Sequence, residues 1–327
     1  MDIFYPIQFF ADIVSYKLVG LAQGSYLGSS INFFIYDTIK IGLLLVIINY
    51  VMAITRYYFP MERARDILTK KRWFGLNYLM AAALGIVTPF CSCSSIPLFI
   101  GFMGAGIPLG ITFAFLISSP LINESSLYLF PAMFGLKVTV LYNLFGLLIA
   151  VVGGMIIQKL KVEKYIIPEL LKFKSRTQIE KDNGGSKLSF KKLIAYFWKD
   201  GMKITKKIFP YVVLGVAVGA IIHGFVPTNF VEHYLSAESW WNVPLAVLLG
   251  APLYANSVSV LPIMESLVGK GAPLGTVLAF MTAIVTLSLP EVLILKKVMR
   301  WQLLAIFFGI TVVGIIIMGY LFNLILR

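Results

Sequence analysis

Charged side chains are scarce in this sequence. Aspartate, glutamate, lysine and arginine make up 13% of its 327 residues, whereas they make up about a quarter of a soluble domain. Hydrophobic residues make up 59%, and the mean hydropathy is +0.86. Several apolar runs reach about 20 residues, which lets a helix cross about 30 Å of hydrocarbon. The scarcity of charge excludes an ordinary soluble domain and predicts an all-α, polytopic integral membrane protein.

Cysteine is nearly absent, since Cys91 and Cys93 are the only two. Two cysteines on one C-x-C step cannot build a disulfide scaffold, and a bond between them would be strained. The first residues, MDIFYPIQFF, contain neither a basic start nor a small-residue cleavage site. We therefore expect no cleavable signal peptide.

The net charge of +13 could indicate either nucleic-acid binding or a membrane topology. Of the 28 lysines and arginines, six lie in residues 56–72, fourteen lie in 159–207, and three more are Lys296, Lys297 and Arg300. Each segment lies between apolar runs, as cytoplasmic loops do under the positive-inside rule. A nucleic-acid-binding protein would instead mix basic and aromatic residues in a soluble domain. We therefore expect cytoplasmic loops of a multi-pass cell-membrane protein and no nucleic-acid partner.

The apolar and basic segments divide the chain into four parts. Residues 1–30 are amphipathic and are expected to lie at the membrane interface. Residues 31–158 and 208–327 each contain a series of apolar runs, some long and some broken. The basic residues 159–207 join them as a cytoplasmic linker. The sequence thus predicts two transmembrane halves.

The two halves resemble each other when position 96 is aligned with position 261. Residues 96–116 (IPLFIGFMGAGIPLGITFAFL) then align with residues 261–281 (LPIMESLVGKGAPLGTVLAFM). Identical pairs include Pro97 and Pro262, Gly106 and Gly271, Pro108 and Pro273, Leu109 and Leu274, Gly110 and Gly275, Ala114 and Ala279, and Phe115 and Phe280. Shared membrane composition is one explanation, but the shared helix breakers favour an internal repeat.

Loop charges indicate that the two repeats have opposite orientations. The first span, roughly 31–54, ends at a basic loop, whereas its counterpart at 208–226 begins at one. The span at 137–158 ends at the basic linker, and its counterpart at 302–325 begins beside Arg300. Many secondary transporters are built from such inverted repeats and bind substrate at broken helices near the bilayer midplane. The predicted fold class is therefore an inverted-topology helical repeat with broken or re-entrant helices.

Broken helices are expected at matching places, in residues 88–123 and 252–291. Proline removes a backbone donor and glycine adopts conformations that other residues avoid, so both interrupt helices. The predicted breaks are Pro89, Pro97, Gly106 and Pro108 in the first half, and Pro262, Gly271 and Pro273 in the second. Irregular backbone at membrane depth is tolerated only against protein or a watery cavity. The two regions are therefore candidates for a substrate cavity.

Cys91 and Cys93 lie in the first of these regions, within the sequence TPFCSCSSIP. Residues i and i+2 point about 200° apart on a helix but to the same side of an extended segment. An extended or irregular backbone would let the two thiols converge on a thiophilic partner, such as trivalent arsenic or a d¹⁰ metal. The alternative interpretation is that two small residues pack in a crowded helix break.

The sequence TPFCSCSSIPLFIGFMGAGIPLG, followed by FLISSPLINESS, closely resembles the signature of the ArsP/YraQ-type predicted permeases. The second-half sequence GAPLYANSVSVLPIMESLVGKGAPLGTVLAFM resembles the corresponding region. The resemblance implies a permease, and in the best-studied members efflux of trivalent organoarsenicals through a cysteine pair that maps to Cys91 and Cys93. Many members carry a cysteine after PLY in the second half. This chain has Asn256 near that place, so the resemblance implies no three-thiol site here.

Polar residues within apolar runs complete the candidate site, because membrane burial makes them costly. The predicted substrate-binding residues are Cys91, Ser92, Cys93, Ser94, Asn123, Asn256 and Ser257, with Cys91 and Cys93 as candidate metal ligands. Glu124 and Glu291 are candidates for proton coupling, although a carboxylate after a helix break also stabilises a helix N-terminus. Asp37 and Lys40 are spaced i,i+3 on the first span, which predicts a local ion pair.

The favoured function is a secondary-transporter-like permease that exports a small thiophilic solute, an organoarsenical or a soft-metal species, from a site where the repeats meet. One alternative is a membrane thiol-disulfide oxidoreductase that uses Cys91 and Cys93, although such enzymes more naturally use C-x-x-C. Another is a permease for a sulfur-containing metabolite. The chain has no G-x-x-x-x-G-K-[ST] motif. Energy for transport would therefore come from an ion gradient or a partner ATPase. We expect no enzyme activity and no cofactor, with the lipid bilayer and a small solute as partners; a homo-oligomer is compatible with the sequence.

Overall fold

A computed structural model of the chain describes residues 4–58, 75–87, 92–123, 125–167, 190–225, 240–253, 257–269 and 271–326. Within these ranges every regular element is a helix, apart from one isolated β-bridge between Ile166 and Met299. The prediction of an all-helical protein is therefore confirmed for this part of the chain.

The helices of the first half are short except for two. They are α1 (Tyr5–Asp12), η1 (Ile13–Leu18), α2 (Tyr26–Tyr58), α4 (Leu76–Val87), α5 (Ser92–Gly104), α6 (Leu109–Leu121), η2 (Ser125–Leu129), α7 (Phe130–Lys159) and η3 (Glu163–Tyr165). Gly135 interrupts α7 with a φ of 80°. The α2 helix begins at Tyr26, inside the segment 1–30 that the sequence assigns to the interface.

The second half repeats this alternation of long and short helices. Its elements are α9 (Phe190–Phe225), α11 (Asn242–Gly250), α12 (Ser257–Gly269), α13 (Leu274–Thr286), α14 (Leu289–Leu295) and α15 (Trp301–Ile325). In the described ranges of the whole chain, three segments are long and apolar enough to span a membrane: Tyr26–Val51, Ser125–Lys159 and Trp301–Ile325.

The chain forms two compact units. Unit 1 comprises Met1–Leu43, Pro210–Ile294 and Phe308–Arg327, and unit 2 comprises Leu44–Phe209 and Leu295–Phe307. Unit 2 therefore contains α4, α5, α6 and α7, and unit 1 contains α1, α11, α12 and α13. Three long helices, α2, α9 and α15, contribute residues to both units.

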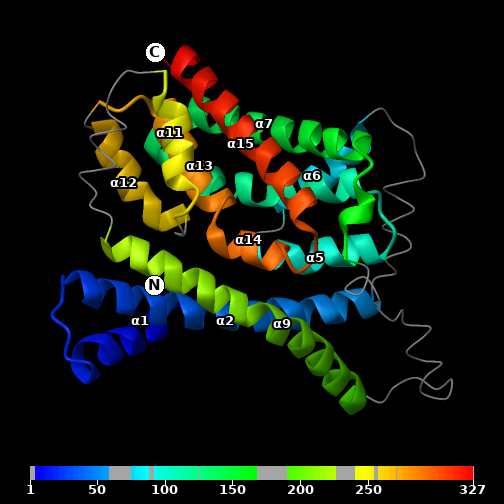
Figure 1. The fold of residues 1–327 in the computed structure, drawn as a ribbon, viewed down its shortest axis with the longest axis horizontal. Helices are drawn as coiled ribbons and strands as arrows, with labels where there is room; N and C mark the ends of the chain where they lie inside the picture. The colour runs from blue at the N-terminus through cyan, green and yellow to red at the C-terminus, as the bar shows by residue number, and fades with distance from the viewer. Residues whose placement is uncertain are drawn as a thin grey trace. The chain divides into compact units, whose positions relative to one another are not determined.

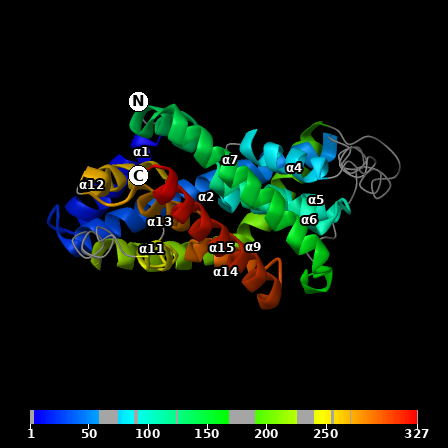
Figure 2. The same cartoon turned by 90° about the horizontal axis from the view of Figure 1, so that it is seen from above.

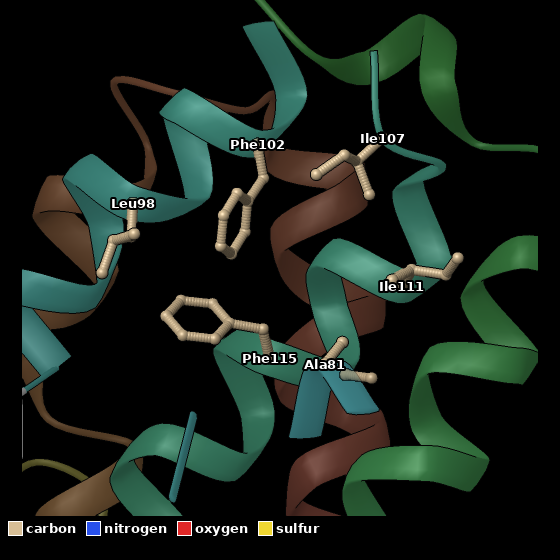
Figure 3. Close-up of a cluster of buried hydrophobic side chains, with 7 residues drawn as sticks. Ala81, Leu98, Phe102, Ile107, Ile111 and Phe115 are labelled. Atoms are coloured by element: carbon tan, nitrogen blue, oxygen red, sulfur yellow. The ribbon is translucent and has the colours of Figure 1, made fainter. Parts of the chain in front are cut away.

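Unit 2 is centred on α6, whose residues are all buried. The α6 helix packs against α4, α5 and α7, and Figure 1 and Figure 2 show these helices side by side. The apolar cluster between α4, α5 and α6 consists of Ala81, Leu98, Phe102, Ile107, Ile111, Ala114 and Phe115. At its centre the rings of Phe102 and Phe115 meet edge to face with their centroids 5.2 Å apart (Figure 3), an arrangement that stabilises by about 0.5–1.5 kcal/mol beyond burial.

Unit 1 is centred in the same way on α13, which is buried over nearly all of its length. The α11 and α12 helices pack against it, and Figure 1 shows α11 beside α13. The hydroxyl of Tyr320 on α15 donates a 2.6 Å hydrogen bond to the carbonyl of Trp240, just before α11. Each unit thus surrounds one short buried helix with longer or flanking helices.

The short helices of the two units share their lengths and their spacing. The α5 and α12 helices each have 13 residues, as do α6 and α13, and the first residues of each pair are offset exactly as Pro97 and Pro262 are. Both α5 and α12 are followed by a glycine with a positive φ, 76° at Gly106 and 88° at Gly271. The amide after each glycine bonds back to a carbonyl five residues earlier, which completes a Schellman cap in both units.

Backbone contacts between helices recur at the same spacing. A β-carbon built on Gly154 of α7 would lie 2.9 Å from the β-carbon of Ala114 on α6. A β-carbon built on Gly319 of α15 would lie 3.0 Å from the β-carbon of Ala279 on α13. Only glycine leaves room for these helices to approach so closely. Small residues at helix interfaces serve this purpose in membranes.

A side-chain amide holds the first turn of each buried helix. Gln158 Oε1 accepts a 2.9 Å hydrogen bond from the amide of Gly110 at the beginning of α6. Asn323 follows Gln158 at the same spacing as Pro262 follows Pro97, and its Oδ1 accepts a 3.2 Å hydrogen bond from the amide of Thr276 at the beginning of α13. The first amides of a helix have no partner within it, so these two side chains satisfy donors that would otherwise be unpaired.

Two of the predicted breaks fall elsewhere. Pro97 lies inside α5 and Pro262 lies inside α12, each at the sixth residue of its helix, so neither ends a helix. At the sixth residue, a proline removes one helical hydrogen bond, and both helices continue past it. The interruption falls instead at Gly106 and Gly271, whose φ values few other residues adopt.

We predict that Gly319→Ala destabilises the protein by about 1–3 kcal/mol, because the added methyl group would overpack the contact between α15 and α13. Gly309 is the matched control on the same helix, since a β-carbon there would meet nothing within 4 Å. Gly309→Ala should leave stability unchanged or raise it by up to about 1 kcal/mol. Thermal unfolding in detergent measures both, and equal midpoints for the two variants would contradict the close approach.

Candidate functional site

The structure describes only part of the site predicted from the sequence. Pro89, Cys91, Glu124 and Asn256 lie outside the described residues. Ser92, Cys93 and Ser94 lie in the first turn of α5, and Ser257 begins α12, but their side chains are not among those described. Asn123 and Glu291 are described in full. The thiol pair as a substrate or metal site therefore stays a prediction.

The backbone at Cys93 differs from the extended or irregular conformation expected there. The α5 helix begins at Ser92, so Cys93 is helical and lies one residue inside the helix. The amides of a first helical turn have no acceptors within the helix.

A buried pair of hydroxyls joins the beginning of α5 to the end of α6. The Oγ atoms of Ser95 and Ser119 lie 2.6 Å apart, and both side chains are buried. Cys93 precedes Ser95 by two residues, and Asn123 follows Ser119 by four. Because a helix rises only about 1.5 Å per residue, Cys93 and Asn123 belong to the same end of unit 2.

Asn123 caps the helical segment that follows the break after α6. Its Oδ1 accepts a 3.1 Å hydrogen bond from the amide of Ser126, and its carbonyl oxygen lies 2.8 Å from Ser126 Oγ. A side-chain oxygen that accepts from the third following amide is the usual helix N-cap arrangement. Asn123 therefore has a structural task, and substrate contact stays a prediction.

Asn143 on α7 fastens this capped segment from the other side. Its Nδ2 donates to the carbonyls of Ser126, at 3.2 Å, and Thr139, at 2.9 Å. These two donations fix the orientation of the amide, and its Oδ1 faces Ser126 Oγ at 3.0 Å. Hydroxyl and amide oxygens thus gather where α6 ends and α7 begins.

The matching end of unit 1 is also polar, but it contains a carboxylate. Thr282, Thr286, Ser288 and Glu291 are all buried at the end of α13 and the beginning of α14. Ser288 and Glu291 have the spacing of a capping box, S-x-x-E, at the helix beginning. At the offset of the repeat, Glu291 corresponds to Ser126 and not to Glu124, so the two carboxylates do not occupy equivalent positions.

The donors in these two polar ends are chemically different from the thiols. Hydroxyl, amide and carboxylate oxygens are hard ligands, whereas thiolates are soft. Among the side chains that the structure describes, no three His, Cys, Asp or Glu residues gather into a metal-binding group. A thiophilic solute would therefore depend on the cysteine segment, and the oxygens would orient it.

Four residues of the polar end of unit 2 were not predicted to belong to the site: Ser95, Ser119, Ser126 and Asn143. Asn143 had a recognisable signal, because an amide within the apolar run VLYNLFG is unusual. The serines had none, because a hydroxyl in a membrane helix can bond to its own backbone.

We predict that Asn143→Asp destabilises the protein by about 1–3 kcal/mol, because a carboxylate oxygen would replace the amide donor and face two carbonyl oxygens. Asn323→Asp is the matched control. There the essential oxygen acts as acceptor for the Thr276 amide, and the Thr276 hydroxyl can turn to donate to the new carboxylate. Unfolding midpoints in detergent distinguish the two, and a tolerated Asn143→Asp would show that the amide is not a donor.

The chain is similar to a curated protein from an archaeon. The UPF0718 protein MJ0584 of Methanocaldococcus jannaschii is 22% identical over 340 residues, which cover 86% of this chain and 93% of the relative. No solved structure matches the chain.

A family match covers most of the chain. Residues 26–324 match the family ArsP_1, described as a predicted permease. This range extends from the beginning of α2 almost to the end of α15 and includes both units with their polar ends. Together with the apolar helices, the match indicates a multi-pass membrane protein of the permease type. The chain belongs to the ArsP_1 family of predicted permeases.

Proposed function

We propose that this permease is a secondary transporter that exports a small thiophilic solute, a trivalent organoarsenical or a soft-metal species. The solute would bind at the broken helices, with Cys91 and Cys93 as its soft ligands. Energy would come from an ion gradient or from a partner ATPase.

The observation that carries this proposal is the repeated geometry of the short helices. Two pairs of equal helices, two Schellman caps and two amide-held helix beginnings all recur at the one offset of the sequence repeat. Transporters with internal repeats place the substrate at discontinuous helices in corresponding positions. In our proposal, residues 31–158 and 208–327 are the two repeats, joined by the linker 159–207 after an interfacial N-terminal segment.

Hydrogen bonds within unit 2 support an inverted orientation of these repeats. The amide of Arg300 donates to the carbonyl of Tyr165 at 2.7 Å, and the amide of Ile167 donates to the carbonyl of Val298 at 3.0 Å. Two of the three basic segments therefore lie against each other. The helix α7 enters this place and α15 leaves it, so corresponding helices of the two repeats run in opposite senses relative to it.

A second helix pair in unit 2 supports the same arrangement. Asn49 on α2 donates a 3.0 Å hydrogen bond to Thr205 on α9, while Ala53 on α2 clusters with Leu193 on α9. These contacts make the two helices antiparallel. The end of α2 that enters the first basic loop and the beginning of α9 that leaves the linker therefore point the same way. We propose that all three basic segments are cytoplasmic.

We predict that cysteines introduced as Lys181→Cys and Glu232→Cys will be labelled from opposite sides of the membrane. Replacing Cys91 and Cys93 by serine first gives a cysteine-free background, because the chain has no other thiol. An impermeant maleimide applied to intact cells and to inverted vesicles is the measurement. Labelling of both positions from one side would reject the inversion and would leave the family assignment unaffected.

The proposed coupling of solute binding to proton release follows from the thiols of Cys91 and Cys93. A buried thiol must lose its proton to bind a soft metal or metalloid, so binding would release protons. Glu124 and Glu291 are proposed to receive them, since intramembrane carboxylates often relay protons. Ser92, Ser94, Asn123, Asn256 and Ser257 would supply polar contacts around the solute.

We predict that Cys91→Ser and Cys93→Ser each lower the flux of a trivalent methylarsenical by about tenfold or more. This corresponds to a loss of about 1.4 kcal/mol in binding. Sulfur-to-oxygen exchange keeps the shape but replaces a soft ligand by a hard one. Flux into inverted vesicles, with arsenite, zinc, cadmium and small thiols as further substrates, is the measurement.

Ser92→Ala is the matched control, because it removes a polar group from the same segment but no thiol, and it should transport at close to the wild-type rate. A double serine variant that transports at the wild-type rate would assign the cysteines to packing alone. Reversible oxidation of the pair coupled to a quinone, without any flux, would favour the oxidoreductase.

A further inference from the structure

Asp37 is a buried carboxylate in the first membrane-spanning helix. The side chain is 6% exposed, and it lies on the buried face of α2 with Ile41 and Leu45, each four residues further along. The opposite face of the helix carries exposed Ile39, Leu43, Ile47 and Val51. The spacing of four residues keeps each set on its own face. Asp37 therefore points into the protein and away from lipid.

The ion pair expected between Asp37 and Lys40 is not formed. The Lys40 ammonium lies 5.1 Å from the ring centres of both Phe4 and Tyr36 and 3.4 Å from the Tyr36 hydroxyl. Two aromatic faces attract an ammonium ion, and they hold this one away from the carboxylate. Within the described part of the chain, Asp37 forms neither a hydrogen bond nor an ion pair.

No other cation in the described part of unit 1 can neutralise Asp37. The cation Lys17 on η1 is exposed. Among the acidic residues, Glu265 on α12 is also exposed. Asp12 on α1 accepts hydrogen bonds from Gln8, at 2.9 Å, and Asn32, at 2.7 Å, so it is already engaged. Glu291 on α14 is buried and would add a second negative charge if ionised. In the described part of unit 1, Asp37 and Glu291 are therefore buried, Asp12 is half-buried, and the half-buried Lys40 ammonium is turned toward aromatic rings.

An ionised carboxylate in this position would have no hydrogen-bond donor in the described part of the chain, and its nearest cation, Lys40, attracts it without forming an ion-pair contact. Burying an unpaired charge at membrane depth is strongly unfavourable, whereas a protonated carboxyl group is a modest polar burden. The favourable state of Asp37 in this conformation is therefore the neutral acid. If the helix face opened to water, the hydrated carboxylate would become favourable, and the O–H bond would break with transfer of the proton to water.

We propose that Asp37 is a proton-binding site of the transport cycle, loaded while it is buried as here and discharged when water reaches it. The coupling role rests on the proposed transport function, whereas the bound proton does not. Asp37 would act in the first membrane helix, apart from the polar helix ends that carry Asn123 and Glu291.

Infrared spectroscopy of the full-length protein in lipid vesicles at neutral pH tests the bound proton without any substrate. The wild-type spectrum should contain the carbonyl band of a protonated carboxyl group, and Asp37→Asn should lose it. Glu265→Gln, which changes an exposed carboxylate of the same unit, should retain the band. Coincident spectra of wild type and Asp37→Asn would overturn the proposal.

Lys40→Met provides a second variant in case Asp37→Asn fails to fold. If the ammonium is held by the aromatic rings, removing it should leave the wild-type band in place. A band that is missing from wild type and appears only in Lys40→Met would mean that Asp37 is ionised and paired with Lys40, which overturns the proposal.

Flux of the trivalent methylarsenical then tests the coupling. Asp37→Asn should lose the acceleration that a pH gradient gives to wild type but should retain exchange of labelled for unlabelled solute, which needs no net proton movement. Full acceleration in Asp37→Asn would reject the role of Asp37 and leave the transporter intact. If the wild-type protein shows the infrared band and the double serine variant of Cys91 and Cys93 transports at the wild-type rate, the thiol site is rejected and the bound proton is supported.

Discussion

Backbone amides and carbonyls inside a membrane must find their partners within the protein, and the short helices of this permease depend on that constraint. Each of the helices α6 and α13 begins after a turn, so its first amides have no helical acceptor. Gln158 and Asn323 supply acceptors from the neighbouring long helices. The close approach at Gly154 and Gly319 brings these side chains within reach. Helix breaks at membrane depth are therefore stable here because a side chain from a neighbouring helix accepts a hydrogen bond from an amide that has no acceptor within its own helix.

At the polar ends of the two units, side chains again pair with groups that a helix break leaves unpaired, but the residues differ between the units. In unit 2, Asn143 and Asn123 satisfy the backbone and hydroxyl groups of the segment that follows α6. In unit 1, the corresponding place contains Ser288 and the buried Glu291. The architecture is shared, but the chemistry is not: one end has neutral amides beside the cysteine segment, and the other has a titratable group.

The sequence predicted the helical class, the spans near residues 31–54, 137–158 and 302–325, and the turns at Gly106 and Gly271. These turns were recognisable because glycine adopts a positive φ that few other residues adopt. Pro97 and Pro262 were poor guides because a helix can continue through a single proline at the cost of one hydrogen bond. The Ser95–Ser119 pair and the position of Lys40 could not be predicted, because each depends on a partner distant in sequence. The thiol site stays a prediction from sequence alone.

Hydrogen bonds between residues 165–167 and 298–300 join the segment after α7 to the beginning of α15. These two parts of the chain are therefore held together by backbone pairing, although they are far apart in the sequence. A cut in the peptide chain between residues 168 and 189 would leave this fastening in place. Two separately synthesised half-length polypeptides would thus retain a docking point, and covalent continuity is not what joins the halves there.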